Sequence, residues 1–288
     1  IVRATALTEL TRYPSAQALA AFVAGATDPD GLVRLAALGG LELFPPEESL
    51  AAVGPLLSDP LRGVRAEAAR MLARFGPTEL GPFAEPARAA VAEFEAIQHA
   101  LLERPEAHLN LAQLELARGR TAEAEAELRA GLRLDPLFVP CYVNLADLAR
   151  TTRGEPEAEG ILRDGLALVP DAPALHHALG LALVRQQHPK DGLAALARAA
   201  ELAPRAPRYG FVHAVALHDL GEPEAARAAL ERVLAENPED RDARFALANY
   251  RGEAGDQEGA ERCLRELAAI NPHDPGLAGF LAPSTPGR

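Results

Sequence analysis

Small and apolar residues recur every 34 residues through the second part of the chain, in five segments that start at positions 105, 139, 173, 207 and 241. The eighth and twentieth positions of each segment are alanine or glycine, and the twenty-fourth is always leucine. A period of this length is typical of stacked pairs of helices. Small residues let two helices approach closely, and the leucines are expected to fill the space between repeats. The pattern therefore predicts an all-α fold, an α-solenoid.

Prolines and glycines mark the expected helix boundaries. A proline closes each predicted second helix, and these prolines stand 34 residues apart at Pro136, Pro170, Pro204, Pro238 and Pro272. A glycine in the left-handed conformation is expected where a first helix ends, at Gly119, Gly154, Gly221 and Gly255. Another proline is expected to begin the second helix of three repeats, at Pro156, Pro189 and Pro223.

The 34-residue pattern resembles the tetratricopeptide repeat (TPR) family, in phase over residues 105–272. The family's large aromatic residues at positions 4 and 11 are replaced in most of these repeats. Packing between helices is therefore expected to rely on leucine and alanine, in agreement with 5% aromatic residues and no tryptophan. The resemblance implies a right-handed superhelix whose first helices line a concave face.

A different period appears upstream, where a Val-Arg pair recurs every 31 residues. Asp-Pro precedes the second and third pairs, which gives a turn and a helix start. We expect the valine to pack inward and the arginine to reach the neighbouring repeat's turn. This part resembles the short bacterial form of HEAT-like repeats. The pairs are Val2-Arg3, Val33-Arg34 and Val64-Arg65.

These patterns predict four segments. Residues 1–76 are HEAT-like repeats truncated at the N-terminus, so we expect the chain to open in mid-repeat with something preceding it. Residues 77–104 are a Gly/Pro junction and a connecting helix from Ala87 to Glu103, on which Val91, Phe94, Ile97 and Leu101 share a face. Residues 105–272 are five TPR repeats, and residues 273–288 are a short cap (Pro275–Leu281) and a disordered tail (Ser284–Arg288). The two arrays either form one rigid superhelix or flex between Gly76 and Pro86.

In the TPR family, positions 2, 5, 9, 12 and 13 of each repeat usually meet the ligand. Positions 5, 9 and 12 carried over to this chain predict the groove residues Leu109, Gln113, Leu116, Val143, Asp147, Arg150, His177, Leu181, Val184, Phe211, Val215, His218, Phe245 and Asn249. The family's carboxylate clamp needs a lysine where Leu109 stands, although Asn144 matches the clamp asparagine, so a clamp is not expected. The largely apolar groove suits an amphipathic helix or an extended segment. The alternative is that these side chains pack on one another or under a covering helix.

Composition narrows the function further. A net charge of −12 argues against nucleic acid as a partner. No run of about 18 apolar residues is present, so no membrane span is expected. The sequence has no phosphate-binding glycine loop, His-Glu-x-x-His, Gly-x-Ser-x-Gly or Cys-x-x-Cys motif. Cys141 and Cys263 are expected to be buried thiols. We therefore expect a protein that is not an enzyme.

Four histidines fall in the first helices of adjacent repeats and raise an alternative: His176, His177, His213 and His218. If they cluster, they are candidates to ligate a metal ion or a haem. The other interpretation is that they are hydrogen-bonded histidines of the core. We favour the second, because His176 and His213 occupy packing positions, and we predict no metal site.

The succession of HEAT-like repeats, connecting helix and the stretch Arg104-Pro105-Glu106-Ala107-His108-Leu109-Asn110-Leu111 is similar to bacterial proteins that begin with a multihaem cytochrome c region. This chain has no Cys-x-x-Cys-His motif, so no cofactor is expected in it, and haem is expected only in a preceding region. The resemblance implies an extracytoplasmic location, with the cytoplasm as the alternative. The leading hypothesis is a non-enzymatic scaffold that binds a peptide or protein segment in the TPR groove. The alternative is a docking region of an exported multihaem cytochrome, with a c-type cytochrome as the partner.

Overall fold

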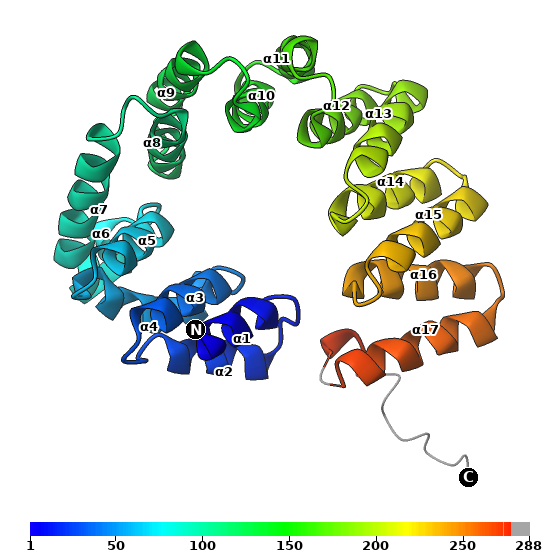
Figure 1. Ribbon diagram of the computed structural model, residues 1–288, viewed down its shortest axis with the longest axis horizontal. Helices are drawn as coiled ribbons and strands as arrows, with labels where there is room; N and C mark the ends of the chain where they lie inside the picture. Colours follow the sequence, from blue (N-terminus) through cyan, green and yellow to red (C-terminus); the bar gives the residue numbers. More distant parts are fainter. Residues whose placement is uncertain (273, 278–288) are drawn as a thin grey trace. The chain divides into compact units, whose positions relative to one another are not determined.

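The computed structural model describes residues 1–272 and 274–277, and these residues form helices, turns and loops without a β-strand (Figure 1). They divide into two compact units: unit 1 covers residues 1–130, and unit 2 begins at Gly131. Unit 1 contains α1 (Val2–Leu10), α2 (Ala16–Gly25), α3 (Gly31–Leu41), α4 (Pro46–Val53), η1 (Gly54–Ser58), α5 (Arg62–Leu72), α6 (Pro77–Leu80), η2 (Gly81–Phe83), α7 (Ala84–His99), α8 (Pro105–Ala117) and most of α9 (Thr121–Leu134).

Unit 2 consists of successive helix pairs with the predicted 34-residue step. Its helices are α10 (Val139–Thr152), α11 (Glu155–Leu168), α12 (Pro173–Arg185), α13 (Pro189–Leu202), α14 (Pro207–Asp219), α15 (Pro223–Glu236), α16 (Arg241–Glu253) and α17 (Gln257–Ile270), followed by η3 (Pro275–Leu277). Each second helix, from α9 to α17, ends two residues before its closing proline, as predicted. The predicted α-solenoid is therefore confirmed.

A continuous apolar core runs through unit 1 from α2 to α8. It includes Phe22 on α2, Leu38 on α3, Leu80 on α6, Phe94 on α7 and Leu114 on α8. The glycine- and proline-rich junction is thus packed into this core. The change from 31- to 34-residue repeats at position 105 is not a boundary between compact units, because α8 lies in unit 1.

The connecting helix differs from its predicted bounds, since α7 runs from Ala84 to His99. Val91 and Phe94 are buried as the spacing predicts, but Leu101 lies beyond the helix and is 37% exposed. The reason is the proline that begins α8. It disfavours helical backbone in the residue before it, and Arg104 is extended, with φ −113° and ψ 131°.

Arg34 joins two neighbouring 31-residue repeats in the predicted way. Its Nε and Nη2 donate to the two carboxylate oxygens of Asp59 at 2.6 and 2.9 Å. Its Nη1 donates to the carbonyl oxygen of Asp28, in the preceding turn, at 2.7 Å. Both members of the ion pair are buried, with 8% of Arg34 and 6% of Asp59 exposed. One side chain therefore holds the turn before its own helix and the turn of the next repeat.

The other two arginines of this series make equivalent contacts. Arg3 donates to both carboxylate oxygens of Asp28 at 3.0 Å, and Arg65 donates to both oxygens of Glu93, on α7, at 2.6 Å. The valine before each of the two later arginines is buried, as predicted. Val2 does not follow the prediction and is 83% exposed, because no helix of the described residues covers its face of α1.

The closest approach of two helices in unit 2 involves a pair of glycines. A Cβ atom added to Gly180 on α12 would lie 2.9 Å from the carbonyl oxygen of Gly192 on α13, and one added to Gly192 would lie 3.0 Å from that of Gly180. These are the eighth and twentieth positions of the third repeat. The predicted role of small residues there is therefore seen directly.

The chain's C-terminal part is described only as far as Leu277. Asp274 is buried and accepts hydrogen bonds from Nε and Nη2 of Arg241 at 2.5 and 2.9 Å. Leu277, in η3, is fully buried. The rest of the predicted cap, as far as Leu281, and the predicted tail from Ser284 lie outside the described residues.

The left-handed turn between the two helices of a repeat is made without glycine in the third repeat. The four predicted glycines have φ between 73° and 100°, whereas Gln187 fills the corresponding place with φ 64°. A residue with a Cβ is strained in this region of backbone space.

Gln187→Gly is therefore expected to raise the free energy of unfolding by about 1 kcal/mol, measured by urea denaturation. The matched control is Gln186→Gly, one residue earlier, where φ is −80°. The control variant should gain nothing, because the residue there is not strained. Equal gains from the two variants would contradict the assignment of strain to Gln187.

Candidate functional site

The first helices of unit 2 form the inner edge of its curve, where α10, α12 and α14 follow one another (Figure 1). A cleft of about 310 Å³ lies on this edge. It is lined by residues of α10 and α12, two residues of α11 and the first turn of α14. The lining residues are Val143, Asn144, Ala146, Asp147, Arg150, Ala158, Leu162, His177, Ala178, Leu181, Ala182, Arg185 and Arg208.

The cleft brings together the groove residues that the sequence predicts from the second repeat and two from the third. These are Val143, Asp147, Arg150, His177 and Leu181. Val143 and Leu181 are half-buried and supply apolar surface, while the side chain of Asp147 is 71% exposed at the rim.

Two arginines of the cleft were not among the predicted residues. Arg185 stands at position 13 of the third repeat and Arg208 at position 2 of the fourth. Both positions belong to the family's ligand-contacting set, but only positions 5, 9 and 12 were carried over. Applying the full set would have found them.

The cleft is lined by three guanidinium groups and one carboxylate. Arg150 donates to Oδ1 of Asp147 at 2.7 and 3.1 Å, and Arg185 pairs with Glu155 of α11. Arg208 is exposed and has no hydrogen bond or ion pair to any residue that the structure describes. The cleft therefore has local positive charge in a chain whose net charge is −12.

His177 lies in the wall of the cleft and is only 8% exposed. Its ring lies against that of Tyr209, at the start of α14, with centroids 5.2 Å apart and an interplanar angle of 60°. Neither ring nitrogen has a hydrogen-bond partner among the described residues. Burial, and then the positive charge of Arg208, lower the pKa of His177, so the imidazole is neutral at pH 7.

Several other predicted groove residues contact the protein itself. Val184 faces α13, with Cγ2 2.7 Å from where a Cβ on Gly192 would lie. Phe211 packs against the core of α14, α15 and α16. Phe245 lies under the guanidinium of Arg241, 5.6 Å from its ring centroid. For these residues the alternative prediction, packing within the protein, describes the contacts better. Val215 is half-buried and Asn249 exposed.

The four histidines do not converge on one site. His176 bonds to the carbonyl oxygen of Pro170 at 2.8 Å. His218 stacks on Tyr250 with ring centroids 3.8 Å apart, and its Nε2 lies 2.7 Å from Glu253. His213 lines a separate cavity between α13 and α15. Within the described ranges, no three histidine, cysteine, aspartate or glutamate side chains form a group suited to a metal ion.

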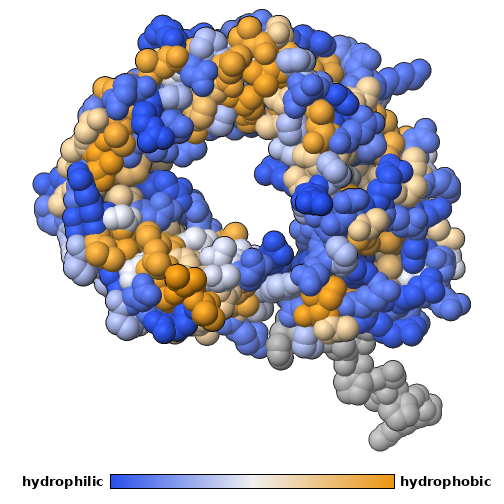
Figure 2. Space-filling view, viewed as in Figure 1, coloured by the Kyte–Doolittle hydropathy of each residue, from blue (hydrophilic) through white to orange (hydrophobic). Residues whose placement is uncertain are grey.

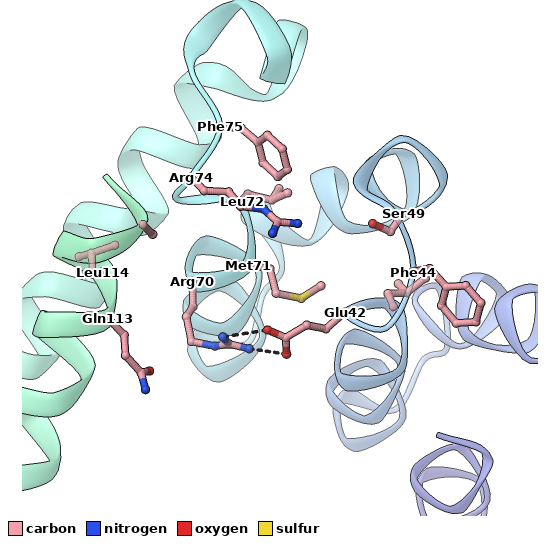
Figure 3. A pocket seen from close by; sticks show the side chains of 12 residues that line it. Glu42, Phe44, Ser49, Arg70, Met71, Leu72, Arg74, Phe75, Gln113 and Leu114 are labelled. Atoms are coloured by element: carbon pink, nitrogen blue, oxygen red, sulfur yellow. Dashed lines mark hydrogen bonds and ion pairs between the residues drawn. The ribbon is translucent and has the colours of Figure 1, made fainter. Parts of the chain in front are cut away.

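The groove predicted as one surface is divided between the two units, since Leu109, Gln113 and Leu116 belong to α8 in unit 1. Leu109 and Leu116 are half-buried. Gln113 lines a cavity of about 210 Å³ inside unit 1, with Met71 and other apolar side chains. Figure 3 shows this cavity, with a paired arginine and glutamate between α5 and the end of α3.

The charges of the unit 1 cavity are already paired. Arg70 donates to both carboxylate oxygens of Glu42, at 3.1 and 2.8 Å, and to Oε1 of Glu67 at 2.7 Å. These two carboxylates raise the pKa of Arg70 above its ordinary value. The cavity therefore offers less to a charged ligand than the cleft of unit 2.

Models of the tetratricopeptide repeat match residues 105–148, 177–228 and 217–282, and a model of HEAT repeats matches residues 1–73 and 19–93. The chain consists of HEAT repeats followed by TPRs. Both predicted repeat types are thus confirmed. All of the matching models describe repeats, and the resemblance to multihaem cytochromes gains no support from them.

Solved structures of TPR proteins share this fold at low sequence identity. YrrB, described as a TPR protein with an unusual peptide-binding site, is 24% identical over 62% of this chain and 91% of its own, with a TM-score of 0.45. PilF of Pseudomonas aeruginosa is 18% identical over 73% and 94%, with a TM-score of 0.48. MamA of Desulfovibrio magneticus RS-1 is 17% identical over 58% and 94%, with a TM-score of 0.46. Among curated proteins, none matches this chain in sequence.

The surface of unit 2 is mostly hydrophilic over α14 to α17 in the view of Figure 2. In the part of the chain that the structure describes, no helix is long and apolar enough to cross a membrane.

Proposed function

We propose that the chain is a non-enzymatic interaction scaffold and that the cleft of unit 2 binds a peptide or protein segment. The observation that supports this most is the cleft itself. It joins the first helices of three successive TPRs and combines apolar walls with a charged rim. Its volume is at the lower end of the range for ligand pockets, about 300–1,000 Å³, which suits side chains of a bound segment.

The chemistry of the cysteines agrees with a binding role. Both thiols are buried, and burial raises the pKa of Cys141 to about 11 and also raises that of Cys263. A thiol with a raised pKa stays protonated at neutral pH and is a poor nucleophile. HEAT and TPR arrays are in general non-catalytic scaffolds, and the sequence carries none of the catalytic motifs considered above.

The test begins with selection of binding peptides from a displayed library of randomised dodecapeptides. Leu181→Asp is expected to weaken the selected peptides about tenfold or more, because it places a charge on the apolar wall of the cleft. Binding is measured by isothermal titration calorimetry, and helicity by circular dichroism.

The matched control is Leu168→Asp, at the end of α11, where the side chain is 51% exposed and does not line the cleft. This variant should bind as the wild type does. The proposal fails if the library yields no binding peptide, or if folded Leu181→Asp retains full affinity.

Two finer predictions remain with the sequence resemblance. Docking to a c-type cytochrome and an extracytoplasmic location both stay predictions, as does haem in a region before Ile1.

A further inference from the structure

We propose that the cleft of unit 2 takes an acidic segment of a partner protein, with an aspartate or glutamate side chain bound by Arg208 and His177. This inference rests on the proposed function and adds the chemical class of the ligand. It differs from a carboxylate clamp in its residues, because Leu109 already excludes the clamp lysine.

The first argument is the state of the three arginines. Arg150 is paired with Asp147 and Arg185 with Glu155, so their charges are partly neutralised. Arg208 faces the same cleft without a partner among the described residues. A guanidinium offers five N–H donors in a planar fork that matches a carboxylate. The group that would complete this cleft is therefore an anion.

The second argument is His177, which is independent of the first. A buried imidazole whose nitrogens lack hydrogen bonds is unfavourable, and such groups in native proteins are rare. Its contact with Tyr209 places it next to the residue that follows Arg208 in sequence. A neutral imidazole keeps one N–H, which a bound carboxylate oxygen can accept. A single carboxylate thus satisfies both an unpaired cation and an unpaired donor.

Charge complementarity also favours a short acidic segment over other ligands. The cleft is locally positive, so a basic segment would be repelled by Arg208. The chain as a whole carries a net charge of −12, which opposes the approach of a long polyanion such as nucleic acid. The bound side chain comes from within the segment in this proposal, and a terminal carboxylate is the alternative source that the test separates.

The experiment uses the library of dodecapeptides with acetylated and amidated ends, which removes terminal charges. Peptides selected by the wild-type chain are expected to be enriched in aspartate and glutamate. Replacing the key glutamate of a selected peptide by glutamine should weaken binding about tenfold, because a charge-assisted hydrogen bond is lost. If only peptides with a free C-terminus bind, the side-chain assignment is overturned.

Arg208→Glu tests the proposed ion pair, and the variant should fold because Arg208 is exposed. Acidic peptides are expected to bind it at least about tenfold more weakly than the wild type. The matched control is Arg205→Glu, which makes the same charge change three residues away at an exposed position outside the cleft. It should leave affinity nearly unchanged. Equal losses in the two variants would indicate a general charge effect and overturn the assignment.

The pH dependence tests His177. The charged and titratable groups facing it are Asp147 and Arg150 on α10, Arg185 on its own helix, and Arg208 and Tyr209 on α14. A bound carboxylate stabilises the imidazolium, so affinity for the acidic peptide should rise as the pH falls from 8 to 6. His177→Asn should remove this rise while keeping the preference for acidic peptides. An unchanged pH profile in His177→Asn would overturn the role of His177.

Failure of this inference can be told apart from failure of the proposed function. If the wild type selects no peptide, the proposed function fails. If it selects peptides without acidic residues and Leu181→Asp loses them, the cleft binds peptides but the ligand class proposed here is wrong.

Discussion

Asp59→Ala is expected to lower the free energy of unfolding of the chain by about 3 kcal/mol. The substitution removes the partner of Arg34 and leaves a guanidinium buried, with only 8% of the residue exposed. An uncompensated buried charge costs more than the pair itself contributes, because the desolvation of the remaining ion is no longer offset. Asp59 also accepts the N–H of Leu61, so the turn before α5 loses a hydrogen bond as well.

The loss should depend on pH in a defined direction. Burial alone would raise the pKa of Asp59, but hydrogen bonds from Arg34 and the Leu61 N–H outweigh it, and the pKa lies below its ordinary value. Such a carboxyl stabilises the fold above its unfolded-state pKa, and the contribution disappears as the pH falls through the lowered folded-state value. The difference between wild type and Asp59→Ala should therefore be largest near pH 7 and shrink below about pH 4.

Urea denaturation at a series of pH values measures this effect. Arg3→Ala is the control, because it breaks the equivalent ion pair where the arginine side chain is 64% exposed, and it should change the midpoint little. The double variant Arg34→Met, Asp59→Leu should recover much of the loss, since no charge is left buried. A single variant as stable as the wild type at pH 7 would contradict the role given to this pair.

Leu196→Ala is expected to cost about 2–5 kcal/mol, the range for a leucine truncated in a core that does not collapse. Leu196 is the invariant leucine of the third repeat and is fully buried. Its Cγ lies 2.6 Å from where a Cβ on Gly180 would stand, so it packs directly over the closest approach of α12 and α13. The two backbones already touch there, so they have little room to move in and fill the cavity.

Hydrogen exchange would show where Leu196→Ala acts. Repeats interact with their nearest neighbours, so α12 and α13 should lose protection first and α11 and α14 next, while α3 and α5 of unit 1 keep theirs. Leu168→Ala is the control, because that leucine is 51% exposed. Protection lost uniformly through both units would rule out this local coupling.

The helical pairs of this protein could be predicted closely because each boundary has a local chemical cause. Prolines cannot continue a helix, and glycines accept the left-handed turn, so the 34-residue step appears in the sequence as it does in the fold. Gln187 shows the limit of this logic, because tertiary packing holds a residue there in a conformation that its own preferences oppose. The end of α7 was missed for a simpler reason: the restriction that Pro105 places on Arg104 was not applied.

The candidate site could be predicted only in part. Position numbers carried from the family identify which helix face a residue occupies, but neighbouring repeats decide what the side chain touches. Val184 turns toward α13 because Gly192 leaves room for it, a fact that no position rule contains. Conversely, Arg208 contributes to a cleft that consists mainly of residues from the two preceding repeats. Contacts between repeats, more than positions within one, determine the site.

The constant phase of the first helices separates the length of the array from its specificity. Removal of residues 173–206 would bring Pro207 into the place of Pro173 and keep every later helix in step. The cleft would then face Val143 and Asp147 with Phe211, and both His177 and Leu181 would be gone. Recombination between repeats can in this way exchange one recognition surface for another while the buried leucines and alanines stay the same.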